Sequence, residues 1–101
     1  MRILMKISFP VEKFNRCVLE GNAGQKIQRI LEEARPESVY FLAENGKRGG
    51  IMIVNIDKAS DYPKFAEPWF LSFDAAVEFL PIMTPEDLQK SGLDELGKKW
   101  R

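Results

Sequence analysis

Five polar residues fall at positions predicted to lie in β-strands, and three of them carry groups that can move protons. Lys6 offers an amine, Glu78 a carboxylate and Tyr40 a phenol. Such groups serve as general acids or bases when burial or neighbouring charges tune their pKa values. Ser8 and Asn55 add a hydroxyl and an amide for hydrogen bonds to a ligand. We therefore predict Lys6, Tyr40 and Glu78 as candidate catalytic residues, and Ser8 and Asn55 as candidate ligand-binding residues.

The same positions also have a structural interpretation. Lys6 and Glu78 are expected on neighbouring strands, where a cross-strand ion pair contributes up to about 1 kcal/mol, with Tyr40 as an amphipathic rim residue. Trp69 and Phe70 lie in a predicted helix. If their side chains line a cavity beside the polar groups, they are candidate ligand-binding residues. Otherwise they form an apolar stripe of the helix that packs on the sheet. The sequence leaves both alternatives open.

Composition removes several classes of function. The chain of 101 residues has no histidine, which excludes a histidine-based catalytic triad, a histidine-ligated haem and an imidazole metal site. We expect no metal and no cofactor. Fifteen basic residues balance fifteen acidic ones, so no overall field draws the protein to nucleic acid or to an anionic membrane. We expect neither as a partner.

The cysteine content and the first ten residues bear on the cellular compartment. Cys17 is the only cysteine, which fits a reducing environment, and its apolar neighbours indicate a buried, inert thiol. Residues 1–10 alternate apolar and polar side chains, unlike the continuous apolar stretch of a signal peptide. No run of residues reaches membrane-spanning length. We therefore expect a cytoplasmic protein.

Hydrophobic spacing predicts the elements that position these residues. Alternation over residues 2–9 predicts a half-buried strand. Apolar residues then recur every three or four positions from Pro10 to Ala34, which predicts a helical stretch. Gly21 and Gly24 are expected to break or kink this stretch.

A β-hairpin is predicted next. Residues 38–44 and 50–56 are rich in β-formers, and Asn45-Gly46 between them is turn chemistry. The loop over residues 45–50 has two cations and flexible backbone donors, so it either holds a phosphate or carboxylate or is a plain solvated turn. Residues 48–55 fall where an RNA-recognition motif keeps its stacking aromatics, but those rings are missing. We expect no platform for single-stranded RNA.

A second helix and a fourth strand follow the hairpin. Ser60 or Asp61 is expected to cap the helix, and Pro68 to kink or shorten it. Residues 74–83 are predicted to form the fourth strand. A C-terminal helical extension over residues 84–100 begins with capping chemistry.

The order β-α-β-β-α-β predicts one α+β domain over residues 1–101, with ferredoxin-like topology. Such a domain has a four-stranded antiparallel sheet with helices on one face. Residues 51–56 are apolar on both faces, so the second face also needs a cover. We predict a homodimer that packs sheet against sheet. In the alternative, the C-terminal helix folds back over this face with its apolar side, Leu88, Leu93, Leu96 and Trp100.

A resemblance that extends over nearly the whole chain is carried by three stretches: MRILMKISF, NGKRGG with IMIVNI, and EPW followed by FDAAVEFLPIMTPEDL. They resemble the dimeric α+β barrel superfamily, and within it uncharacterised domains similar to muconolactone isomerase. The resemblance implies two ferredoxin-like sheets that form a barrel across a two-fold axis, with a ligand cleft beside each sheet. Because the superfamily's activities are diverse, it implies no particular reaction and no catalytic residue.

Two functions therefore remain open. The first is binding of a small organic molecule in a barrel cleft by a cofactor-independent isomerase or monooxygenase, with an aromatic-derived or polyketide-like substrate and with Glu78 or Lys6 as acid/base. The second is a non-catalytic dimerisation or ligand-sensing domain. An open cleft that converges on Lys6, Tyr40 and Glu78 favours the first, and a sealed apolar interior favours the second.

Overall fold

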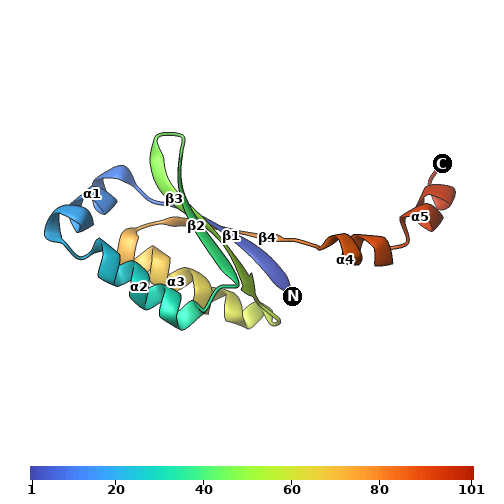
Figure 1. Ribbon diagram of the computed structural model, residues 1–101, viewed down its shortest axis with the longest axis horizontal. Helices are drawn as coiled ribbons and strands as arrows, with labels where there is room; N and C mark the ends of the chain where they lie inside the picture. Colours follow the sequence, from blue (N-terminus) through green and yellow to red (C-terminus); the bar gives the residue numbers. More distant parts are fainter.

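A computed structural model describes all 101 residues and places three helices against one face of an antiparallel sheet (Figure 1). The strands, in the spatial order β2-β3-β1-β4, are β1 (Arg2–Ser8), β2 (Ser38–Glu44), β3 (Lys47–Asn55) and β4 (Ala76–Pro81). The helices are α1 (Val11–Glu20), α2 (Ala23–Ala34), α3 (Tyr62–Phe73), α4 (Pro85–Lys90) and α5 (Leu93–Lys99), and a short 3-10 turn (Ala59–Asp61) precedes α3. This α+β arrangement is compatible with a ferredoxin-like fold.

The central strand β1 shows how the sheet acquires one buried face. Ile3, Met5 and Ile7 are almost fully buried against the helices, whereas the residues between them are only partly buried. Because side chains alternate across a strand, the partly buried residues Leu4, Lys6 and Ser8 point to the opposite face of the sheet. The predicted half-buried strand is confirmed.

An aromatic cluster joins the helices to the sheet. The ring of Phe9 lies with its centroid 4.7 Å from that of Phe14 and 5.1 Å from that of Phe73. Trp69 is fully buried, with its ring centroid 5.9 Å from Phe9. Aromatic contacts at these separations add to the energy of area burial. The cluster fixes α1 and α3 on the same side of the sheet.

The helices differ from the prediction in two places. Gly21 ends α1 in a left-handed conformation with φ of 77°, as predicted, but Gly24 lies inside α2 and breaks nothing. Pro68 does not shorten α3, which continues to Phe73. Pro68 removes one N–H donor from the helix, but buried Trp69 and Phe73 hold the following turn against the core. None of the α-helices is both long and apolar enough to cross a lipid bilayer.

The hairpin turn is tighter than predicted. Asn45 and Gly46 both have positive φ, 55° and 75°, which suits a two-residue hairpin turn. The strand β3 begins at Lys47 rather than residue 50, so the predicted six-residue loop was wrong. Gly49 is required there because a Cβ atom would lie 2.6 Å from the backbone oxygen of Ile7. These residues pair with β2 instead of forming a flexible anion-binding loop.

Arg48, one of the two cations of that predicted loop, is also engaged. Its Nη1 donates a hydrogen bond to Asn15 Oδ1 over 2.7 Å, and its guanidinium lies 4.8 Å from the centroid of the Phe14 ring. Both contacts tie the hairpin to α1. The structure thus favours the structural interpretation of this segment.

Residues 84–101 form a C-terminal arm that extends away from the sheet (Figure 1). The predicted capping box is present: Asp87 N donates to Thr84 Oγ1 over 3.1 Å, and Thr84 N donates to Asp87 Oδ2 over 3.0 Å. The extension is two short helices rather than one, because Gly92 adopts a positive φ of 76° between them. The alternative in which it covers its own sheet is wrong, since its four large apolar side chains are exposed: Leu88, Leu93, Leu96 and Trp100.

Candidate functional site

The sheet face opposite the helices is not covered within this chain. We call it the open face. Its centre is apolar, with Leu4, Ile51 and Ile53 half-buried by their neighbours alone. The strand register places these residues on it: Arg2, Leu4, Lys6, Ser8, Ser38, Tyr40, Leu42, Glu44, Lys47, Gly49, Ile51, Ile53, Asn55, Ala76, Glu78 and Leu80.

The three predicted proton-transfer residues share one row across the open face. Lys6 pairs with Glu78 on β4 and with Ile51 on β3, and Ile51 pairs with Tyr40 on β2. Neighbouring strands lie about 4.8 Å apart, so the backbones of Lys6 and Tyr40 are separated by about 10 Å. Lys6 and Glu78 are thus direct neighbours, while Tyr40 stands two strands away.

A fourth titratable residue, which was not predicted from the sequence, lies outside this row but contacts it through its side chain. Glu44 Oε1 lies 2.7 Å from Lys6 Nζ, at the end of β2. The hydrogen bond and charge of Glu44, with a smaller effect of Glu78, raise the pKa of the Lys6 ammonium above its ordinary value. Lys6 therefore stays protonated at neutral pH. Alternation from Tyr40 along β2 would have placed Glu44 on this face, but its reach to Lys6 depends on the register.

The four predicted ligand-binding residues are divided among three places. Ser8 lies on the open face, paired with Gly49 and Ala76. Asn55 lies on the same face but at the end of β3, where it pairs with Arg2 and its Oδ1 accepts a hydrogen bond of 2.6 Å from the N-terminal ammonium. Trp69 is fully buried, and Phe70, on the same helix α3, is 39% exposed. Both belong to the helix layer, so the sheet separates them from Lys6.

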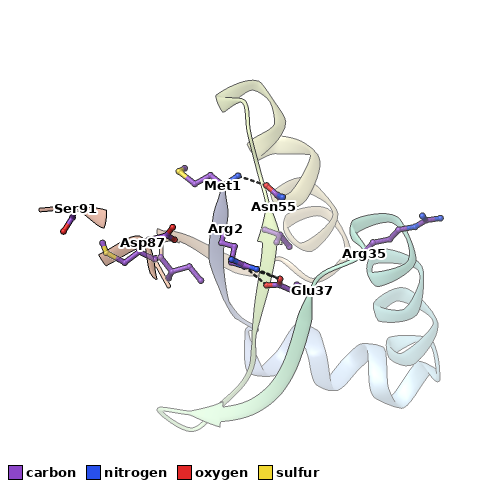
Figure 2. A pocket seen from close by; sticks show the side chains of 10 residues that line it. Met1, Arg2, Arg35, Glu37, Asn55, Asp87 and Ser91 are labelled. Carbon is purple, nitrogen blue, oxygen red and sulfur yellow. Dashed lines mark hydrogen bonds and ion pairs between the residues drawn. The ribbon is translucent and has the colours of Figure 1, made fainter. Parts of the chain in front are cut away.

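Apart from the open face, the chain has a hollow of about 850 Å³ where the end of the sheet meets the C-terminal arm (Figure 2). Arg2 lines this hollow, and its guanidinium donates three hydrogen bonds of 3.0 to 3.2 Å to the Glu37 carboxylate. The N-terminal ammonium contacts Asp57 Oδ1 at 2.7 Å. The residues lining the hollow are Met1, Arg2, Arg35, Glu37, Val54, Asn55, Ile82, Met83, Asp87 and Ser91.

All the charged groups around this hollow except Arg35 have partners within the chain. The hydrogen bond from Arg2 lowers the pKa of the Glu37 carboxyl, and Glu37 in turn raises the pKa of Arg2. The backbone N–H of Thr84, followed by its hydroxyl, lowers the pKa of Asp87. Arg35 points away from the Arg2 and Glu37 pair in Figure 2. Because Arg2, Glu37, Asp87 and the N-terminal ammonium already have partners, we interpret the hollow as structural and place the candidate site on the open face.

The Arg2 and Glu37 pair gives a prediction about pH. The native state holds the pKa of Glu37 below its ordinary value of 4.5, so the unfolded chain takes up this proton first as the pH falls. The pair's contribution is fully present above the unfolded pKa and is lost as the pH falls through the native pKa. We expect Glu37→Gln to flatten the decline of the unfolding free energy between about pH 5 and pH 3, measured by urea titration.

The matched control for this experiment is Glu67→Gln. Glu67 is exposed and forms no ion pair, so this change is expected to leave the slope as it is in the unaltered protein. Asp57 and Asp87, whose pKa values are also lowered, should keep part of the slope in Glu37→Gln. An identical slope in both variants would contradict the role given to Glu37.

Comparison with protein-family models gives no match, and comparison with curated protein sequences gives none either. The class of protein therefore rests on the fold and on the site. Together they define an α+β domain with an antiparallel four-stranded sheet, one face packed by helices and the other carrying a polar row on an apolar surface.

Proposed function

We propose that this chain functions as a homodimer that binds a small organic molecule between two open faces and does not catalyse a reaction. The observation that carries the proposal is the row of Tyr40, Lys6 and Glu78 in the middle of an apolar sheet face that its own chain leaves uncovered. Ligand sites typically combine an apolar lining with a few convergent polar groups.

A second copy is the cover that suits this face best. Tyr40 and Leu80 are exposed beside the half-buried apolar centre, and a contiguous apolar patch of this kind marks an interaction surface. Two sheets pack face to face about 10 Å apart, and a two-fold axis lets the same surface serve both copies. The result would be a barrel of the dimeric α+β type, which the sequence resembles.

The charges on the open face suggest the ligand's chemistry. Near the polar row each copy contributes two ammoniums, Lys6 and Lys47, and two carboxylates, Glu44 and Glu78, and Glu78 forms no ion pair within the chain. Because Lys6 is already paired with Glu44, closing the dimer would bury the Glu78 carboxylate without an ion-pair partner. Burying an unpaired charge is costly. A ligand with an apolar body and a protonated amine or another hydrogen-bond donor would offset that cost.

The protonation of Lys6 weighs against this residue as the general base of an isomerase or monooxygenase. A general base must be deprotonated near the working pH, whereas the ion pair with Glu44 raises the pKa of Lys6. Lys6 is therefore better suited to holding a hydrogen-bond acceptor than to abstracting a proton. This supports a ligand-sensing domain.

Native mass spectrometry of the purified protein tests the proposal. We expect a dimer that carries the extra mass of a co-purified small organic molecule. Glu78→Gln removes the charge on which the ligand depends, so we expect its occupancy to fall at least about tenfold, as for a lost charged hydrogen bond. Glu67→Gln, on the outer side of α3, should retain the full extra mass.

Two results would contradict this proposal. A monomer at micromolar concentration would overturn the dimer. A dimer without extra mass, which also takes up no member of an added set of apolar amines, would overturn ligand binding. Equal occupancy in the unaltered protein and in Glu78→Gln would remove Glu78 from the site.

A further inference from the structure

The strand β2 forms one edge of the sheet, and its outer side has no neighbouring strand. Edge strands in natural proteins usually carry a lysine, a proline or a bulge that blocks pairing with another chain. None of these is present in β2, whose seven residues SVYFLAE pair with β3 without interruption and have one charge, Glu44, at the end. The strand β4 at the opposite edge has Glu78 in its middle and ends with Pro81. The edge that remains open to another strand is therefore β2.

The hairpin turn determines which backbone groups of β2 point outward. In a two-residue turn the flanking residues, here Glu44 and Lys47, form a hydrogen-bonded pair, and such pairs alternate along the ladder. The oxygen of Arg48 accepts a hydrogen bond of 2.9 Å from Phe9 N, so it faces away from β2, as this alternation requires. The residues of β2 whose N–H and C=O groups point outward are therefore Val39, Phe41 and Ala43.

Phe41 lies in the middle of this edge and is 51% exposed. Its ring lies across Gly50, since a Cβ atom at position 50 would be 3.2 Å from Phe41 Cδ1. Gly50 pairs with Ile7 and both are buried under the helices, so Phe41 is on the helix-facing side of the sheet. The sheet-to-sheet dimer would cover Tyr40 on the open face and leave Phe41 exposed. The ring of Phe41 is thus an apolar surface beside free backbone groups, which a strand added to this edge would cover.

We infer that β2 of one copy pairs antiparallel with β2 of a second copy, with Phe41 opposite the partner's Phe41 on a two-fold axis. In this register Val39 faces the partner's Ala43. All the outward N–H and C=O groups of both strands then have partners, as in recognition by strand addition. The inference goes beyond the proposed function, because it concerns the edge of the sheet and not the open face.

Registers shifted by two residues leave some of these groups without a partner. One shift places Val39 opposite Asn45, which lies in the turn where β2 has already ended. The other places Ala43 opposite Glu37, whose N–H already donates to Ile53 O over 2.8 Å. The symmetric register is therefore the one in which this edge is complementary to itself, and self-complementarity identifies a second copy as the partner.

The side chains agree with the symmetric register. Phe41 meets its counterpart on the helix-facing side, and aromatic pairs across two strands are favourable. Tyr40 faces the partner's Leu42 on the open face, and Glu44 faces the partner's Ser38, so no like charges are opposed. A strand edge of this length buries less area than a standard interface, so this contact should be weaker than the sheet-to-sheet dimer and form at higher concentration.

Disulfide trapping in the full-length protein tests this inference. Phe41→Cys places two identical thiols opposite each other across the axis, where Cα atoms about 5.5 Å apart suit a disulfide. Mild oxidation at high protein concentration should therefore yield a covalent dimer, detected by its mass. The native Cys17 is buried and stays in the chain.

The matched control is Ala43→Cys on the same edge. Position 43 faces position 39 of the partner, so two copies of position 43 lie about 14 Å apart along the strands, too far for a disulfide. We expect Ala43→Cys alone to give at least about tenfold less covalent dimer than Phe41→Cys. Mixing it with ¹⁵N-labelled Val39→Cys should restore trapping, as a mixed dimer of intermediate mass.

The outcomes separate this inference from the proposed sheet-to-sheet dimer. A dimer in native mass spectrometry without trapping at position 41 would overturn edge pairing and spare the proposed function. A monomer at micromolar concentration whose Phe41→Cys variant is still trapped would do the reverse. Equal trapping in Phe41→Cys and in Ala43→Cys alone would indicate random collision and overturn edge pairing, as would a mixture of the variants at positions 39 and 43 that gives no mixed dimer.

Discussion

Trp69→Ala is expected to lower the free energy of unfolding by about 3 to 5 kcal/mol, the usual cost of removing a large aromatic side chain from a core. Trp69 is fully buried and packs beside the rings of Phe9 and Phe73, with centroids 5.9 and 6.2 Å away. Its loss leaves a cavity where α3 meets the sheet. Urea denaturation followed by circular dichroism measures the change.

Two further variants make this prediction specific. Phe70→Ala changes the adjacent aromatic residue, which is partly exposed, so it should cost much less than Trp69→Ala. Trp69→Phe keeps most of the ring volume and removes an indole N–H that is buried without an acceptor. It should therefore also cost less. Equal losses for Phe70→Ala and Trp69→Ala would contradict the position of Trp69 in the core.

Ile53→Glu is expected to weaken the proposed dimer at least about 100-fold, because a carboxylate buried at the centre of an interface without a partner costs several kcal/mol. Ile53 pairs with Leu4 and Ser38 on the open face, away from the helix layer. The monomer should stay folded, since the new charge faces water there. Sedimentation across a concentration series gives the dissociation constant, and circular dichroism reports the fold.

Leu19→Glu is the control for the interface. Leu19 is a large apolar residue that is exposed on α1, in the layer on the other side of the sheet. We expect this variant to dimerise like the unaltered protein. If Ile53→Glu also dimerised normally, the open face would not be the interface, and the ligand site proposed there would have no cover.

The sequence by itself determined the elements that depend on local physics. Alternation over residues 2–9 located β1 and its buried face, because side chains point to opposite sides of a strand. Asn45-Gly46 located the hairpin, because both residues tolerate the positive φ that the turn needs. Thr84 located the start of α4, because its side chain caps the helix.

Part of the candidate site also followed from the sequence. Lys6 and Glu78 were predicted to be neighbours because the order of elements fixes which strands are adjacent and alternation fixes the face. The place of Tyr40 in the same row depends on the register between β2 and β3. The reach of Lys6 to Glu44 was not predictable, because it depends on the register between β2 and β3 and on the conformation of a long side chain.

The tertiary structure alone decided the features that depend on contacts between distant segments. The strand β3 begins at Lys47, where it pairs with Glu44 of β2, and Gly49 within it packs against the backbone of β1, a contact between distant segments that local propensities do not describe. The helix α3 passes through Pro68 because burial of Trp69 and Phe73 outweighs one lost hydrogen bond. The path of the C-terminal arm also depends on the tertiary structure, because it is set by where β4 ends. The apolar residues of the arm indicate that its helices pack against a surface, but they do not indicate which surface.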